Sequence, residues 1–201
     1  KELIKYIGIV SATWLAINLP FALTTPTGWW RFYKLNLDRG ADWGSIWLAL
    51  QQLGINFTNL NYLSILLLLI TMTSIAIVLF ELKYTPTLAS VAFLVLASVM
   101  VASKVYSPQY VLWLTPLAIL ALRDLRDRKY FWIWQGAEVV YHFAVWQYLA
   151  EYSGSRFGLS PRAYALATLI RVAVTVLFAV AVSTRSKAPQ LGEFLSSSIA
   201  G

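Results

Sequence analysis

The residues best suited to chemistry lie in a short polar, cationic segment between two apolar runs, at positions 102–113. The flanking runs, 88–102 and 110–122, both suggest helices, but each is shorter than the roughly 20 residues that span a bilayer core. Pro108 prevents a continuous helix there because it lacks a backbone donor and disfavours helical backbone at Ser107. Broken backbone at membrane depth is tolerated only where protein buries it or where it lines a wet cavity.

Such a cavity would be lined by a cation and by side chains that form hydrogen bonds: Lys104, Tyr106, Ser107, Gln109 and Tyr110. The plainer interpretation is an ordinary hairpin turn whose lysine extends its amine to the membrane surface. The residues alone leave both interpretations open.

A second group of ionisable residues lies inside apolar stretches. Glu138 and His142 are four residues apart and so share one face of a helix, and Arg171 lies near the middle of the last apolar run. Charges at that depth cost about 2.5–3.5 kcal/mol each, so they pair or face a cavity. One interpretation is a Glu138/Arg171 ion pair with His142 beside it. The other is that Arg171 and His142 reach an anionic lipid headgroup. Both predict that the three lie close together.

No metal centre is predicted from these residues. One histidine and one glutamate make an incomplete site, and the chain has no cysteine.

Four of the nine tryptophans fall in the long polar and aromatic segment 24–59. Its apolar side chains recur at helical spacing: Trp43, Ile46, Trp47 and Leu50. We expect Asp42 to cap this helix. A shorter face of the same kind precedes it, at Trp29, Phe32 and Tyr33, and should end at Gly40 as a left-handed C-cap.

Two amphipathic helices lying in the membrane interface are the plain interpretation of this segment, because Trp and Tyr favour headgroup depth. The functional interpretation is that they cover a cavity and contact a ligand. The polar contacts would then be Arg31, Lys34, Asp38, Arg39 and Asp42.

The pattern predicts an all-α, polytopic transmembrane helical bundle of about six membrane segments, with the amphipathic helices in a long outer loop. The expected segments are 3–23, 60–80, 88–102, 110–122, 130–150 and 162–182. Pro20 should kink or end the first. A single domain is expected over 1–185, followed by a polar, mobile tail at 186–201.

Orientation follows from the Lys and Arg residues, which are in excess in short cytoplasmic loops. Nine lie on one predicted side: Lys1, Lys5, Lys83, Arg123, Arg126, Arg128, Lys129, Arg185 and Lys187. Six lie on the other: Arg31, Lys34, Arg39, Lys104, Arg156 and Arg162. The first side is predicted to be cytoplasmic, so the polar segment around Lys104 faces outward. Two full crossings and a re-entrant hairpin at 88–122 give the same count.

Composition supports a multi-pass membrane protein, and we expect it in the plasma membrane. The chain is 59% hydrophobic and 12% charged, unlike a soluble domain. Its net charge of +7 is dispersed among helix ends, so no nucleic-acid partner is expected. The expected partners are membrane lipids.

The segment Ser103-Lys-Val-Tyr-Ser-Pro-Gln-Tyr-Val-Leu-Trp113 resembles a motif near the C-terminal end of GT-C superfamily glycosyltransferases. The nearest resemblance is to bacterial mannosyltransferase-like members grouped as glycosyltransferase family 87. The stretch from Gly28 to Trp47 also looks like the outer-facing loop of actinobacterial members. The resemblance implies a C-terminal part of such an enzyme, with the N-terminal part of the same protein or a partner membrane subunit completing it.

By this resemblance, the enzyme transfers a sugar from a polyprenyl-phosphate carrier to a lipid or glycan acceptor on the extracytoplasmic side. Lys104 would bind the carrier phosphate, and Tyr106, Gln109 and Tyr110 would orient phosphate or sugar. The residues expected to close the site from above are Arg39, Asp42 and Trp43. The donor is the only small molecule implied, and metal dependence is left open.

The catalytic base is the point where the chain departs from the family pattern. Family members carry it in the first outer loop, which is expected to be missing here. Asp38 and Asp42 are the only acids in the outer segment and are weak candidates for that role.

Two other classes remain beside the enzyme. The chain would suit a non-catalytic subunit that binds the lipid carrier or acts as a scaffold in a membrane complex. A transporter or channel would use the broken hairpin and the buried charges, but there is no inverted repeat.

Overall fold

The computed structural model describes residues 2–82, 85–122 and 128–185, and within them every regular element is a helix. These residues form two compact units, Lys1–Gly40 and Ala41–Gly201, which are described separately. The fold class expected from the sequence, all-α, is confirmed for this part of the chain. The tail predicted at 186–201 lies outside the described residues.

The first unit consists of two helices, α1 (Glu2–Thr24) and α2 (Pro26–Asp38). Pro20 was predicted to kink or end the first helix, and α1 continues past it to Thr24. Trp29 of α2 donates its indole N–H to the Asn18 side chain of α1 over 3.1 Å, and its ring packs edge-on against Trp14. The predicted left-handed cap at Gly40 is wrong, because α2 ends on Arg39 in extended conformation and Gly40 has no positive φ.

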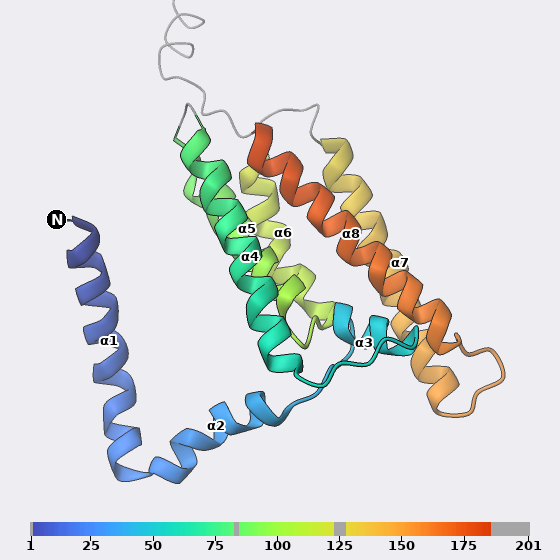
Figure 1. Cartoon of the computed structure of the whole chain (residues 1–201). Helices are drawn as coiled ribbons and strands as arrows, with labels where there is room; N and C mark the ends of the chain where they lie inside the picture. The colour runs from blue at the N-terminus through green and yellow to red at the C-terminus, as the bar shows by residue number, and fades with distance from the viewer. Residues whose placement is uncertain (1, 83–84, 123–127, 186–201) are drawn as a thin grey trace, which may run out of the picture. The chain divides into compact units, whose positions relative to one another are not determined.

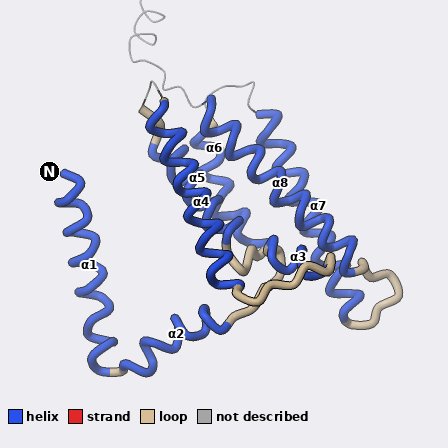
Figure 2. The backbone as a smooth tube through the Cα atoms, viewed as in Figure 1, coloured by secondary structure: helices blue, strands red, loops and turns tan. Residues whose placement is uncertain are grey.

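The second unit contains the remaining helices, shown with their order and path in Figure 1 and by element type in Figure 2. They are α3 (Ile46–Gln52), α4 (Leu60–Glu81), α5 (Leu88–Ala102), η1 (Pro108–Tyr110), α6 (Val111–Ala121), α7 (Arg128–Tyr152) and α8 (Pro161–Arg185). Helix α8 packs along α7 and also contacts α3, α4 and α5. An aromatic cluster fills the centre, where the Trp134 and Phe178 rings stack at 5.3 Å and Phe93 packs edge-on against Phe178 at 5.1 Å.

Helix α3 starts later than the sequence predicted. Its N-cap is Ser45, whose hydroxyl accepts the Leu48 amide at 3.2 Å, so Asp42 is not the cap and Trp43 precedes the helix. The reason is Gly44, whose φ of +75° forms a turn that an α-helix cannot contain.

Three of the described helices are long and apolar enough to cross a membrane: α1, α4 and α8. Helices α5 and α6 are apolar but shorter, as their sequences indicated. The stretch predicted as a span at 130–150 is a helix, α7, but it is not one of these three. The three candidates indicate a multi-pass membrane protein.

Candidate functional site

The polar segment between α5 and η1 is non-helical and lies against the turn that precedes α3. The Asp42 amide donates to the Lys104 carbonyl at 2.8 Å, and the Tyr106 amide donates to the Trp43 carbonyl at 3.3 Å. Two stretches some 60 residues apart are thus joined through their backbones. The sequence placed Lys104, Tyr106 and Trp43 in one site, and the structure brings their backbones together, but the Tyr106 side chain is fully buried.

Arg171 of α8 lies on the buried side of the same segment. Its guanidinium donates from Nη1 to the Tyr106 carbonyl at 2.6 Å and from Nη2 to the Ser107 carbonyl at 3.3 Å. The side chain is fully buried. The broken backbone therefore has the internal hydrogen-bond donors that such a segment requires within a membrane.

A third guanidinium donor, the Nε–H group, is directed to Glu138 of α7. Arg171 Nε lies 3.0 Å and 2.9 Å from the two carboxylate oxygens, and both side chains are buried. The guanidinium also lies over the Tyr106 ring at 3.6 Å and the Tyr141 ring at 4.2 Å. Of the two interpretations of Arg171, the ion pair is the one that the structure contains.

His142 is half-buried one turn after Glu138, and its Nδ1 lies 2.8 Å from the Glu138 backbone carbonyl. The prediction that Glu138, His142 and Arg171 lie close together is confirmed.

Tyr106 joins the polar segment to this pair. Its hydroxyl lies 3.4 Å from Glu138 Oε1 and 3.5 Å from the Thr175 hydroxyl. The phenol can therefore donate its proton to the carboxylate.

Two tyrosines that the sequence analysis did not single out hold the Gly44 turn. The Gly44 amide donates to the Tyr164 hydroxyl at 3.0 Å, and the Tyr141 and Tyr164 hydroxyls are 2.8 Å apart. The available signal was spacing, because Tyr141 adjoins His142 and Tyr164 lies seven residues before Arg171, on the same face of α8.

The Lys104 amine lies at the start of α4. Its Nζ donates to the Asn61 side-chain oxygen at 2.6 Å, and the residue is half-buried. Two residues earlier, the Ala102 carbonyl accepts both the Ser64 hydroxyl at 2.5 Å and the Trp47 indole N–H at 3.0 Å. Asn61 and Ser64 were not predicted, because an amide and a hydroxyl at the start of an apolar helix carry no distinctive pattern.

The other predicted ligand residues are less enclosed. The Asp42 carboxylate accepts the Trp43 amide at 2.7 Å, and the Trp43 side chain is 41% exposed. Gln109 is exposed, and the half-buried Tyr110 stacks on Trp113 at 4.7 Å. Both belong to η1, which follows the non-helical residues 103–107.

Asp38 and Arg39 belong to the first unit. Asp38 forms an exposed ion pair with Lys34 at 2.8 Å, and the hydrogen bond to this carboxylate raises the pKa of Lys34. Exposed pairs of this kind contribute little to stability.

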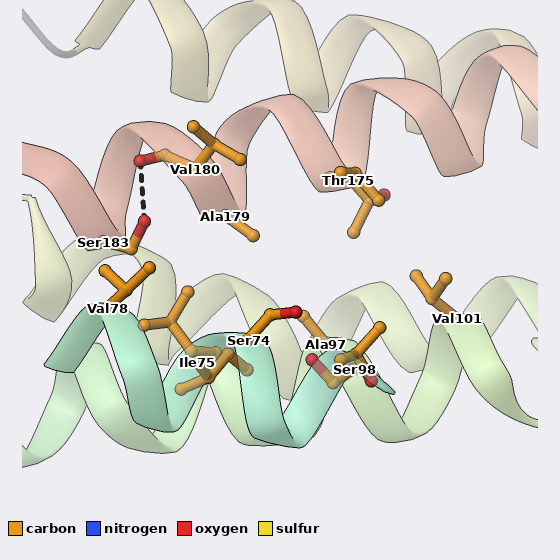
Figure 3. A pocket seen from close by; sticks show the side chains of 13 residues that line it. Ser74, Ile75, Val78, Ala97, Ser98, Val101, Thr175, Ala179, Val180 and Ser183 are labelled. Atoms are coloured by element: carbon orange, nitrogen blue, oxygen red, sulfur yellow. Dashed lines mark hydrogen bonds between the residues drawn. The ribbon is translucent and has the colours of Figure 1, made fainter. Parts of the chain in front are cut away.

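Two hollows lie in the second unit. An apolar groove of about 290 Å³ runs between α4, α5 and α8, with Thr175 and Val101 among its lining and Ser183 further along α8 (Figure 3). A recess of about 380 Å³ is formed by one face of α7 together with Val111 of α6, and Glu138 and His142 line it.

Within the described ranges, no group of three or more His, Cys, Asp or Glu side chains is placed to hold a metal ion. In comparisons with known proteins, no family model, no curated protein and no solved structure matches the chain.

Proposed function

We propose that this chain is the membrane part of a GT-C-like glycosyltransferase and binds the phosphate of a polyprenyl-phosphate sugar donor. The observation that supports this best is the position of Lys104, in a non-helical segment between two short apolar helices and beside the Trp43 turn. The resemblance of the segment to the GT-C motif supplies the reaction class. The sugar would be a hexose, mannose being the closest analogy.

Lys104 acts in this proposal as an electrostatic stabiliser. The carrier phosphate gains negative charge as the sugar leaves, and a fixed ammonium group lowers the energy of that state more than that of the bound donor. The Asn61 oxygen, 2.6 Å away, orients the amine. The backbone of the turn that carries the partly exposed Trp43 is hydrogen-bonded to the same segment.

Arg171 takes a positioning role in the proposal and does not bind the phosphate. Its side chain is fully buried, and three of its donors are directed to the Tyr106 and Ser107 carbonyls and to Glu138. It therefore fixes the backbone on which Lys104 lies.

The apolar groove between α4, α5 and α8 is compatible with a lipid-borne donor, because an isoprenoid chain requires an apolar surface. The proposal further assigns six membrane segments, with α5, α6 and α7 added to the three long apolar helices. It places the Lys104 end of the second unit outside the cytoplasm, in accordance with the Lys and Arg count.

Replacing Lys104 with Met tests the proposal. Transfer of radiolabelled hexose from polyprenyl phosphate by the full membrane protein should fall roughly 100-fold or more, the effect of removing one preorganised group from a developing charge. Lys104→Arg should retain part of the activity.

Arg162→Met is the matched control, because Arg162 is an exposed cation on the same predicted side and lies outside the site. It should leave transfer unchanged. Undiminished transfer by correctly inserted Lys104→Met protein would remove Lys104 from the mechanism.

A non-catalytic carrier-binding or scaffold subunit is the second candidate. It is favoured by the Asp42 carboxylate, which accepts its neighbour's amide and so serves the turn. Donor binding without transfer by the wild-type protein in its complete complex would support this candidate.

A further inference from the structure

The recess between α6 and α7 has a composition that the proposed phosphate site does not explain. It follows one face of α7, where Gln135, Glu138 and His142 supply polar groups and Phe143 and Trp146 supply aromatic rings. Its volume of about 380 Å³ falls in the range of pockets that bind small molecules.

Most hydrogen-bond donors of these polar side chains already have partners. The Gln135 Nε2 group donates to the Thr115 hydroxyl at 3.1 Å. His142 Nδ1 lies 2.8 Å from the Glu138 carbonyl, which can only accept, so the neutral ring carries its proton on Nδ1. The groups left for a ligand are mostly acceptors, namely Gln135 Oε1, His142 Nε2 and a Glu138 carboxylate lone pair, together with the second N–H of Gln135.

Charge in the recess disfavours both phosphate and ammonium ligands. The Glu138 carboxylate is paired with Arg171, so the pair carries no net charge. None of the described residues that line the recess is a lysine or an arginine. A phosphate would find no lysine or arginine and one amide N–H among several acceptors, and an ammonium group would find its anion already neutralised.

An uncharged polyhydroxylated group fits these features. Its hydroxyls can donate to the acceptors and accept from the second Gln135 N–H, while Phe143 and Trp146, which are 70% and 69% exposed, offer flat apolar surfaces to the carbon face of a ring. Both rings lie on a helix surface where a lipid-borne ligand can enter from the side.

We propose that this recess binds the uncharged sugar headgroup of a membrane glycolipid. The identification of that glycolipid as the acceptor rests on the proposed transferase function. The binding itself does not, because it involves neither Lys104 nor turnover. His142 is thereby assigned to a sugar instead of to the anionic headgroup of one of its two interpretations from the sequence.

Photo-crosslinking in vesicles tests this assignment on the full membrane protein. The probe is monohexosyl diacylglycerol with a diazirine on its acyl chain near the headgroup, and phosphatidic acid and phosphatidylethanolamine with the same chain serve as comparisons. The hexosyl probe should label α7 preferentially, near residues 139–146. If free hexitol or hexose does not compete with the hexosyl probe, the recess recognises the sugar only when it is linked to a lipid.

His142→Phe keeps the ring and removes its acceptor, and Gln135→Leu removes another. Each should weaken labelling by the hexosyl probe roughly five-fold, the effect of losing one neutral hydrogen bond of about 1 kcal/mol. Val140→Ala is the control, because Val140 lies on α7, is exposed and does not line the recess.

Preferential labelling by phosphatidic acid or phosphatidylethanolamine would overturn the proposal, as would hexosyl labelling that neither variant reduces. Thermal unfolding of both variants shows whether they fold. If His142→Phe does not fold, the labelling of Gln135→Leu tests the proposal. Loss of transfer in Lys104→Met with intact labelling would separate the two sites.

Discussion

Arg171 illustrates how much of the site depends on single side chains. One guanidinium is shared between the Glu138 carboxylate and two carbonyls of the segment next to Lys104. Because all of these groups are removed from solvent or nearly so, losing one partner leaves the others without a counterpart. Loss of the ion pair should therefore also destabilise the backbone of the segment next to Lys104.

Substitution of Arg171 or Glu138 by Met tests this coupling. Either single variant leaves one buried charge unpaired and should lose about 3–5 kcal/mol of stability. The double variant should lose markedly less than the sum, since no charge is then left alone. Thermal unfolding in detergent measures all three, and additive losses would show that the two residues do not act as a pair.

The depth of these charges in apolar stretches was sufficient to predict that Glu138 and Arg171 lie close together, but it left an ion pair and a contact with a lipid headgroup both open. The carbonyls that Arg171 also binds could not be predicted, because they lie 65 and 64 residues away and backbone acceptors have no sequence signature. The Lys104–Asn61 contact was hidden for a similar reason, being set by how α4 packs against α5.

At the scale of elements, the Gly44 turn joins α3 to the polar segment. A Cβ on Gly44 would overlap the Tyr106 carbonyl oxygen and lie 2.6 Å from the Tyr141 hydroxyl. Its positive φ is also unfavourable for any other L-residue. Both steric exclusion and backbone conformation therefore require glycine here.

Gly44→Ala and Gly54→Ala separate these two effects. Gly54 also has a positive φ, of +96°, but nothing lies within 4 Å of its Cβ position. Gly54→Ala should therefore cost only the conformational penalty of about 1–2 kcal/mol, whereas Gly44→Ala should add about 1–3 kcal/mol of overpacking. Thermal unfolding compares them, and equal losses would contradict the close packing at Gly44.

The helices of the second unit were more predictable than their ends. The boundaries of α5 agree with the apolar run 88–102, and α4 exceeds its predicted range by one residue. The predicted start of α3 was wrong, because the helical spacing of Trp43 and Trp47 gave no sign of the turn between them. Propensity and periodicity locate a helix, but tertiary contacts of Gly44 decide where this one begins.

At the scale of the whole molecule, the number of membrane crossings and their direction remain predictions. Helices α1, α4 and α8 meet the length and hydropathy of a span, while α5 and α6 are too short to do so alone. Their short length is what leaves the Lys104 segment between helix ends, so the count of crossings and the location of the site are linked.

The absence of cysteine from the sequence makes orientation directly testable. Single cysteines at Asn56, Ser155 and Glu81, all exposed positions, can be labelled in intact cells with a membrane-impermeant maleimide. The first two should react from outside and Glu81→Cys only after permeabilisation. The reverse pattern would place the proposed phosphate site in the cytoplasm.

The contacts at the first turn of α4 have a mechanical consequence. Asn61 binds the Lys104 amine and Ser64, one turn further on, binds the carbonyl two residues before that lysine. The segment around Lys104 is thus hydrogen-bonded at two points to one helix, so a shift of α4 along its axis would move the ammonium group as well. A ligand that displaces this segment must either move α4 with it or break both hydrogen bonds.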